Sequence, residues 1–400
     1  MYGLVLEGGG AKGAYQIGVY KALKESGVEI KGVVGSSIGA LNGAMIVQGD
    51  YEKCYEIWNN ISYSMIIDAK DEDMERITQF KWAREDISFL GGKIKSVFTD
   101  RGFDITPFRD SLDEYIDEDK IRNSGMDFGI VTINLSERRA LEVFLPDIPQ
   151  GELKNYLIAS SYLPIFKSEK IGGNTYLDGG FYDNLPFRML RNKGYKDLIL
   201  VRTHARGVIR KMSLEDTNSI IISPSEDLGR SYDCGIDRAR FNMQLGYYDG
   251  LKALNRFKGD RYYIDTKVDS DYYFNYLQNI TEEEVNNMQR ILKLPEIPYK
   301  RALFENIIPK VFSILSMDKE CSYEDFMLCL LEMKAESLNV ERFKVYSFKE
   351  LLSKVEGRKV EINLEESSRL NKFIEKVDII PIFNKDEIVL QIADIIFTKR

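Results

Sequence analysis

A serine between two glycines is the first feature of this chain that could do chemistry. Residues 35–39 read Gly-Ser-Ser-Ile-Gly, between a short apolar run and a run of small residues. A G-x-S-x-G pentapeptide between a strand and a helix is typical of a nucleophile elbow, whose sharp turn exposes the serine hydroxyl at the carboxyl edge of a sheet. Ser36 would need a glycine two positions earlier, where the chain has valine. The pattern therefore predicts Ser37 as a nucleophile, with Gly35 and Gly39 permitting the turn.

A run of glycines near the start of the chain could bind negative charge. It reads Gly8, Gly9, Gly10, Ala11, Lys12 and Gly13. The run follows an apolar stretch at 2–7 and precedes a predicted helix at 14–26, so its backbone N–H groups lie uncovered at a helix start. Beside a nucleophilic serine, the charge to be stabilised is the oxyanion of a tetrahedral intermediate. We expect the N–H groups of Gly9 and Gly10 as donors, with that of Ile38 as a further candidate.

The same glycine run also matches G-x-G-x-x-G, so nucleotide binding is an alternative. A dinucleotide site needs an acidic residue about 20 positions further on. Residues 33–36 of this chain contain none. A P-loop needs Ser or Thr directly after its lysine, but Lys12 is followed by Gly13. We therefore favour the oxyanion hole over both nucleotide sites.

An aspartate and a histidine compete as the base that would activate the serine. Asp178 precedes Gly179 and Gly180, a pattern typical of a tight turn. His204 is the one histidine of the chain and ends a predicted strand at 197–204. The order serine, aspartate, histidine is that of an α/β-hydrolase triad. A free aspartate, with a pKa of about 3.9, is a weak base, although burial would raise that value.

Three motifs in this order resemble those of the patatin-like phospholipases of the bacterial type. They are residues 8–13, 35–39 and 178–180, supported by the segments 103–107, 159–166 and 183–186. The resemblance covers about residues 1–260. It implies a Ser37–Asp178 dyad, no metal or other cofactor, and a lipid acyl ester as substrate. His204 would then have only a supporting or structural role.

The alternation of predicted strands and helices indicates an α/β fold. We expect a mainly parallel central sheet with helices on both faces in a catalytic domain at 1–264. Residues 126–144 are predicted to form a hairpin. From 265 to 400 the chain is predicted to be mostly helical, with a capping box at 281–284 and no catalytic motif. This region could be a helical cap or an oligomerisation element, and the sequence does not indicate an oligomeric state.

The composition is that of a globular, non-membrane protein. The chain is 44% hydrophobic and 30% charged with a net charge of -8, which disfavours nucleic acid as a partner. No apolar run is long enough to span a bilayer. The first predicted strand leaves no room for a signal peptide, and the four cysteines lack metal-ligand spacing, so we expect a cytoplasmic chain. Interleaved aromatic and basic residues at 77–98 fit either aromatic packing over the sheet or peripheral contact with a membrane, and the expected lipid substrate favours the membrane contact.

Two classes of function fit these observations. One is a lipid acyl hydrolase that cleaves carboxylic esters of phospholipids or related acyl lipids. The other is a catalytically silent module that binds a lipid or a protein partner, and an acyltransferase using the same serine is a third alternative. The complete set of nucleophile, base and oxyanion donors favours the hydrolase.

Overall fold

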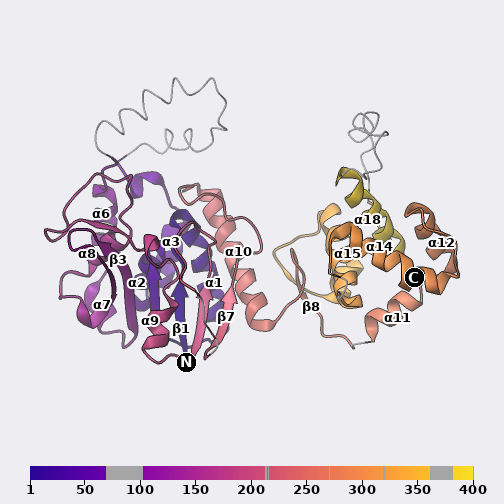
Figure 1. Ribbon diagram of the computed structural model, residues 1–400, viewed down its shortest axis with the longest axis horizontal. Helices are drawn as coiled ribbons and strands as arrows, with labels where there is room; N and C mark the ends of the chain where they lie inside the picture. The colour runs from indigo at the N-terminus through magenta and orange to yellow at the C-terminus, as the bar shows by residue number, and fades with distance from the viewer. Residues whose placement is uncertain are drawn as a thin grey trace, which may run out of the picture. The chain divides into compact units, whose positions relative to one another are not determined.

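The computed structural model divides into two compact units, Met1–Asn255 and Arg256–Arg400. Figure 1 shows the helices and strands of each unit, which are described separately here. The structure describes residues 1–68, 102–211, 214, 216–269, 271–318, 321–360 and 382–399. The aromatic stretch at 77–98 and a helix expected at 365–376 lie outside the described residues.

A seven-stranded, mostly parallel sheet forms the centre of the first unit. Its order is β4-β3-β2-β1-β6-β7, with β5 also paired to β3. The strands are β1 (Tyr2–Leu6), β2 (Ile30–Ser36), β3 (Asp127–Asn134), β4 (Arg139–Phe144), β5 (Tyr176–Asp178), β6 (Asp197–Val201) and β7 (Asn218–Ile222). Only β4 and β5 run antiparallel to their described neighbour, β3. The predicted α/β class is confirmed, and so is the hairpin at 126–144, which is β3 and β4.

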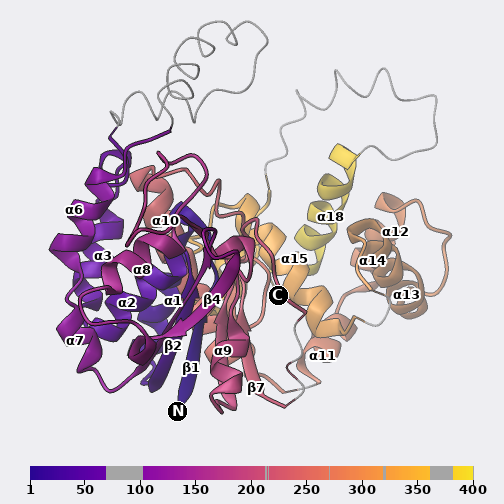
Figure 2. The ribbon, with the colours of Figure 1, turned by 60° about the vertical axis from the view of Figure 1, so that its left-hand side comes forward.

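Helices cover both faces of this sheet, as Figure 2 shows. The helices are α1 (Ala14–Glu25), α2 (Ile38–Gln48), α3 (Tyr51–Asn59), α6 (Thr106–Tyr115), α7 (Glu118–Arg122), α8 (Leu153–Ser160), α9 (Phe187–Asn192) and α10 (Ile236–Asn255). On one face, a buried cluster joins α9 to alternate strand residues: Val5, Val34, Val131, Leu198 and Leu200 with Phe187, Met189 and Leu190. On the other face, a Cβ at Gly43 of α2 would lie 3.1 Å from Val33 and 3.2 Å from Phe128.

Two segments near the carboxyl edge differ from the expectation. β6 ends at Val201, so Thr203 and His204 belong to the loop that follows it rather than to the strand. His204 has a φ of +48°, which no strand residue adopts. The sequence also did not indicate β5, because a three-residue strand is too short to show an alternating pattern.

The second unit is mostly helical and has its own buried core. Its elements are β8 (Tyr263–Asp265), α11 (Tyr272–Gln278), α12 (Glu282–Ile291), α13 (Tyr299–Arg301), the π-helical segment Ala302–Ile307, α14 (Ile308–Leu315), α15 (Tyr323–Ser337), β9 (Val345–Ser347), α16 (Phe348–Val355) and α18 (Ile382–Ile396). The predicted capping box is confirmed, since the Thr281 and Glu284 side chains each bond the other's backbone N–H at the start of α12. Among the described residues, no helix has the length and apolarity needed to cross a membrane.

Candidate active site

Ser37 lies at a sharp, strained turn between β2 and α2. Its φ of +55° and ψ of -127° are a conformation that non-glycine residues rarely adopt. The backbone packs so closely here that a Cβ at Gly35 would lie 2.2 Å from the Gly39 carbonyl carbon, and one at Gly39 would lie 2.3 Å from the Leu6 oxygen. Ser36 is fully buried, whereas Ser37 lines a pocket. The turn therefore places Ser37, rather than Ser36, in the lining of the pocket.

Strand register brings Asp178 to this turn. On β3, Val131 pairs with Ser36 of β2, and the next residue, Thr132, pairs with Asp178 of β5. The Ser37 side chain lies beside the Asp178 carboxylate, close enough for hydrogen bonding to lower the pKa of that carboxyl. The adjoining Gly179–Gly180 turn lies against the sheet, where a Cβ at Gly179 would be 2.2 Å from the Val131 oxygen.

The environment of Asp178 changes its acidity. The residue is 4% exposed, and burial raises the pKa of its carboxyl from 3.8 to about 6. Hydrogen bonds from the Ser37 hydroxyl and, at 2.7 Å, from the Gly180 N–H act in the opposite direction and hold the pKa below what burial alone would produce. A carboxylate with a pKa near 6 is a better general base at neutral pH than a free aspartate.

The glycine-rich loop contains two N–H groups without a hydrogen-bond acceptor among the described residues. The N–H of Gly8 donates to the backbone oxygen of Asn184 at 3.0 Å, and that of Ala11 donates to the backbone oxygen of Ser231 at 2.8 Å. Within the described part of the chain, the N–H groups of Gly9 and Gly10 have no hydrogen-bond acceptor. Gly10, which has a φ of +56°, lines the same pocket as Ser37 and Ile38.

Contacts with the end of β6 hold the glycine loop in place. The buried Glu7 carboxylate accepts hydrogen bonds at 2.7 Å from the Arg202 Nε and from the Thr203 N–H. The Thr203 hydroxyl donates to the Gly8 oxygen at 2.6 Å. The Lys12 ammonium reaches the backbone oxygens of Thr203 and His204 at 3.5 and 3.4 Å. On the other side of the loop, a Cβ at Gly13 would lie 2.5 Å from the Ile38 side chain.

The structure does not bring His204 into the pair formed by Ser37 and Asp178. The residue is exposed. Its hydrogen bond in the described structure is made by its backbone oxygen, which accepts from the Lys12 ammonium. No hydrogen bond between described residues joins the imidazole to Ser37 or Asp178. Across the described ranges, no three His, Cys, Asp or Glu side chains are grouped so that they could hold a metal ion.

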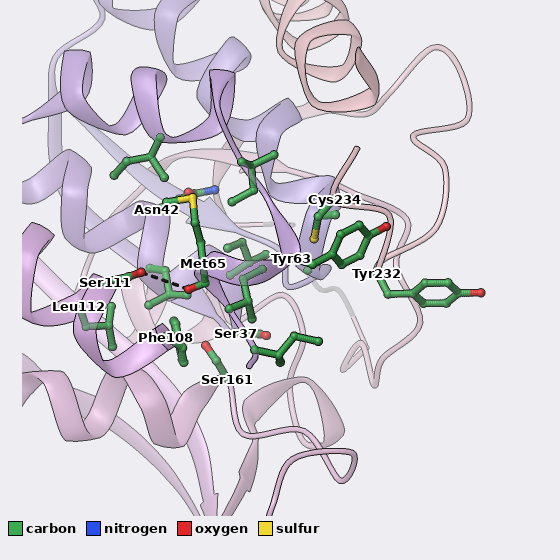
Figure 3. A pocket seen from close by; sticks show the side chains of 18 of the residues that line it. Ser37, Asn42, Tyr63, Met65, Phe108, Ser111, Leu112, Ser161, Tyr232 and Cys234 are labelled. Carbon is green, nitrogen blue, oxygen red and sulfur yellow. Dashed lines mark hydrogen bonds between the residues drawn. The ribbon is translucent and has the colours of Figure 1, made fainter. Parts of the chain in front are cut away.

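An apolar pocket opens beside Ser37 (Figure 3). Its volume is about 250 Å³, and its lining includes Ile38, Leu41, Met45, Trp58, Phe108 and Leu112. Positions 38, 41 and 45 of α2 extend about 10 Å along the helix axis. The pocket is therefore suited to hold a hydrocarbon chain that begins at the serine.

Sequence reasoning missed the role of two serines at the end of α8. Ser160 is fully buried, and its Oγ accepts the Ser37 N–H at 2.9 Å. Ser161 lines the pocket with Ser37. The only signal was the pair of adjacent hydroxyl residues within 159–166, because nothing in the local sequence shows which way they face.

Comparisons with known proteins agree with these motifs. The family model described as "Patatin-like phospholipase" matches residues 4–191. Patatin-like phospholipase domain-containing protein 7 of Rattus norvegicus is 27% identical over 209 residues, which are 51% of this chain and 14% of that protein. Protein 6 of the same series from Homo sapiens is 29% identical over 210 residues, 50% of this chain and 13% of that protein. Lysophospholipase NTE1 of Mycosarcoma maydis is 27% identical over 199 residues, 50% of this chain and 9% of that protein.

These relatives are much longer than the region that they share with this chain, which spans 14% or less of their length. Among solved structures, VipD from Legionella pneumophila aligns with 99% of this chain and 90% of its own at 14% identity and a TM-score of 0.40. The family match includes the glycine loop, the elbow and Asp178. Residues 4–191 of this chain are therefore a patatin-like phospholipase domain.

Proposed function

We propose that this chain is a serine hydrolase that cleaves carboxylic esters of phospholipids or related acyl lipids. The observation that carries the proposal is the position of Ser37, which lies beside the buried Asp178 carboxylate and lines an apolar pocket. The family match over residues 4–191 supports the same class of reaction. Asp178 acts as the base in this proposal, and His204 does not take part.

The reaction has two halves. In the first, Asp178 takes the hydroxyl proton while the Ser37 oxygen attacks the carbonyl carbon, and the resulting oxyanion accepts hydrogen bonds from the N–H groups of Gly9, Gly10 and Ile38. The bond to the leaving oxygen then breaks, and that oxygen takes the proton from Asp178. In the second half, water attacks the acyl-serine and gives its proton to Asp178. The bond between the acyl carbon and the Ser37 oxygen then breaks, the Ser37 oxygen takes the proton from Asp178, and the carboxylic acid leaves.

The apolar pocket holds the acyl chain, and its rim contacts the lipid surface. Ile165 and Tyr232 line the pocket while remaining 50% and 54% exposed, so the pocket has an aliphatic and an aromatic side chain at its surface. Figure 3 shows Tyr232 extending away from the pocket interior. Both residues could enter the interface when a lipid substrate is taken up, which supports peripheral membrane contact.

A serine-reactive fluorophosphonate probe and a panel of acyl lipids test the proposal. The wild-type protein should be labelled and should release fatty acid, and Ser37→Ala should do neither while remaining folded by circular dichroism. A protein that binds lipid without labelling or turnover would be a silent binding module and would overturn the proposal. Transfer of the acyl group to an added alcohol without release of fatty acid would identify an acyltransferase instead.

A further inference from the structure

The Ser161 hydroxyl is a buried polar group that the proposed mechanism leaves unused. The residue is 8% exposed, and its Oγ has no hydrogen-bond partner among the described residues. It lines the same pocket as Ser37, and both labelled side chains lie at the same end of that pocket in Figure 3. A buried hydroxyl without a partner destabilises the folded state. The arrangement therefore favours a ligand oxygen as its partner.

The two neighbours of Ser161 in the chain each contact one member of the proposed dyad. The preceding residue, Ser160, accepts the Ser37 N–H through its Oγ at 2.9 Å. The following residue, Tyr162, accepts the Asp178 N–H through its backbone oxygen at 2.9 Å. Ser161 is thus held between Ser37 and Asp178 by its two neighbours. The glycine-loop N–H groups come from a different segment of the chain.

We propose that Ser161 is a further catalytic residue, whose hydroxyl donates a hydrogen bond to the bridging oxygen of the scissile ester. This inference rests on the proposed hydrolase function. The carbonyl oxygen of the ester is directed to the glycine-loop N–H groups, whereas the bridging oxygen must reach Asp178 to receive its proton. A donor that shares the pocket with Ser37 stabilises the negative charge that develops on the bridging oxygen as its bond to carbon breaks.

Replacing Ser161 by alanine separates catalysis from folding. The variant should lose about tenfold in kcat/KM toward an oxygen ester, the usual effect of one hydrogen bond to a reacting group. Its thermal midpoint should be unchanged or about 2–4 °C higher, because the substitution removes an unsatisfied buried hydroxyl. A merely structural serine would instead lose stability and activity together, and that result would overturn the proposal.

A matched pair of substrates identifies the oxygen involved. A thioester places sulfur, a weak hydrogen-bond acceptor, where the oxygen ester has its bridging oxygen. Ser161→Ala should therefore reduce kcat/KM for the oxygen ester about tenfold and for the matched thioester less than about threefold. Equal losses on both substrates, or no loss on either, would show that Ser161 does not contact the bridging oxygen.

Ser111 provides the control for this experiment. Its hydroxyl lines the same pocket but already donates to the Met65 oxygen at 3.1 Å, as the dashed line in Figure 3 marks. Ser111→Ala should therefore leave the ratio of oxygen-ester to thioester activity at its wild-type value. If Ser37→Ala is inactive while Ser161→Ala matches the wild type on both substrates, only the Ser161 inference fails. If Ser37→Ala retains activity, the proposed function itself fails.

Discussion

The side chain of Ser37 lies beside the carboxylate of Asp178 and lowers the pKa of that carboxyl, although the two residues lie far apart in the chain. Two pairings on β3 produce this contact. Ser36 ends β2 opposite Val131, and Asp178 ends β5 opposite Thr132. Because Val131 and Thr132 are consecutive, the ends of two strands that approach from opposite directions meet at one point of the carboxyl edge.

This contact predicts a hierarchy among three single variants. Ser37→Ala and Asp178→Asn should each abolish hydrolysis of a soluble ester to a similar extent. The two residues act as one unit, so removing either one removes the function of both, and the effects of the two substitutions are not additive. His204→Ala should retain most of the activity, because the hydrogen bond from Lys12 to residue 204 is accepted by the backbone oxygen, which the substitution keeps. The kcat values of the three folded variants on one ester decide the matter. A folded His204→Ala variant as inactive as Ser37→Ala would replace the dyad by a triad.

The raised pKa of Asp178 predicts the pH profile. Only the deprotonated carboxylate can accept the serine proton, so kcat/KM should rise with pH and reach half of its maximum near pH 6. His204→Ala should show the same profile, which distinguishes the Asp178 carboxylate from the imidazole as the titrating group. Loss of the pH 6 inflection in that variant would contradict the assignment.

The same pKa predicts how stability depends on pH. A carboxyl with a pKa of 3.8 unfolded and about 6 folded binds its proton more tightly in the folded state. Its favourable contribution is complete below pH 3.8 and is lost as the pH rises through 6. Asp178→Asn should therefore match the wild type near pH 4 and be more stable by up to about 3 kcal/mol near pH 7. Urea unfolding of both proteins at the two pH values measures this difference.

A pair of glycine substitutions tests the oxyanion loop. A Cβ at Gly10 would lie 2.1 Å from the Ser231 oxygen, so Gly10→Ala should displace the loop and lower kcat by about 100- to 1000-fold. Gly49 has a similar positive φ at the end of α2 but open space around it. Gly49→Ala should cost about 1 kcal/mol of stability and leave kcat unchanged. Similar kcat values for both variants would argue against the oxyanion role.

Filling the apolar pocket should change chain-length preference. Met45 lies on α2 two turns beyond Ile38 and lines the pocket. Met45→Trp should shorten the space for an acyl chain, so kcat/KM for long-chain esters should fall by at least tenfold more than for short-chain esters. Equal changes for both chain lengths would place the acyl chain elsewhere.

In the second unit, one carboxylate of α15 holds the chain that leads into β8. Glu332 is 7% exposed and accepts the N–H groups of Asp260, Arg261 and Tyr262 at 2.9, 3.0 and 2.7 Å. Glu332→Ala should cost about 3 kcal/mol or more, because it leaves buried donors without an acceptor. Glu336, one turn further along α15, forms an exposed ion pair with Arg261. Glu336→Ala should cost about 1 kcal/mol or less. Chemical denaturation of both variants compares the two losses.

The sequence by itself determined the features that depend on a few consecutive residues. The elbow at 35–39, the glycine run at 8–13 and the capping box at Thr281 are readable because glycine spacing and capping side chains act on their own backbone. Strand and helix alternation also determined the α/β class, since burial of the sheet on both faces requires apolar strands between helices.

Only the tertiary structure decided which distant groups meet. The pairing of β5 with β3 places Asp178 beside Ser37, and the early end of β6 leaves His204 exposed. The direction of the Ser161 hydroxyl and the shape of the apolar pocket likewise depend on how α2, α6 and α8 pack. Sheet register and side-chain packing are set by contacts between segments remote in the chain, and a local pattern carries no information on those contacts.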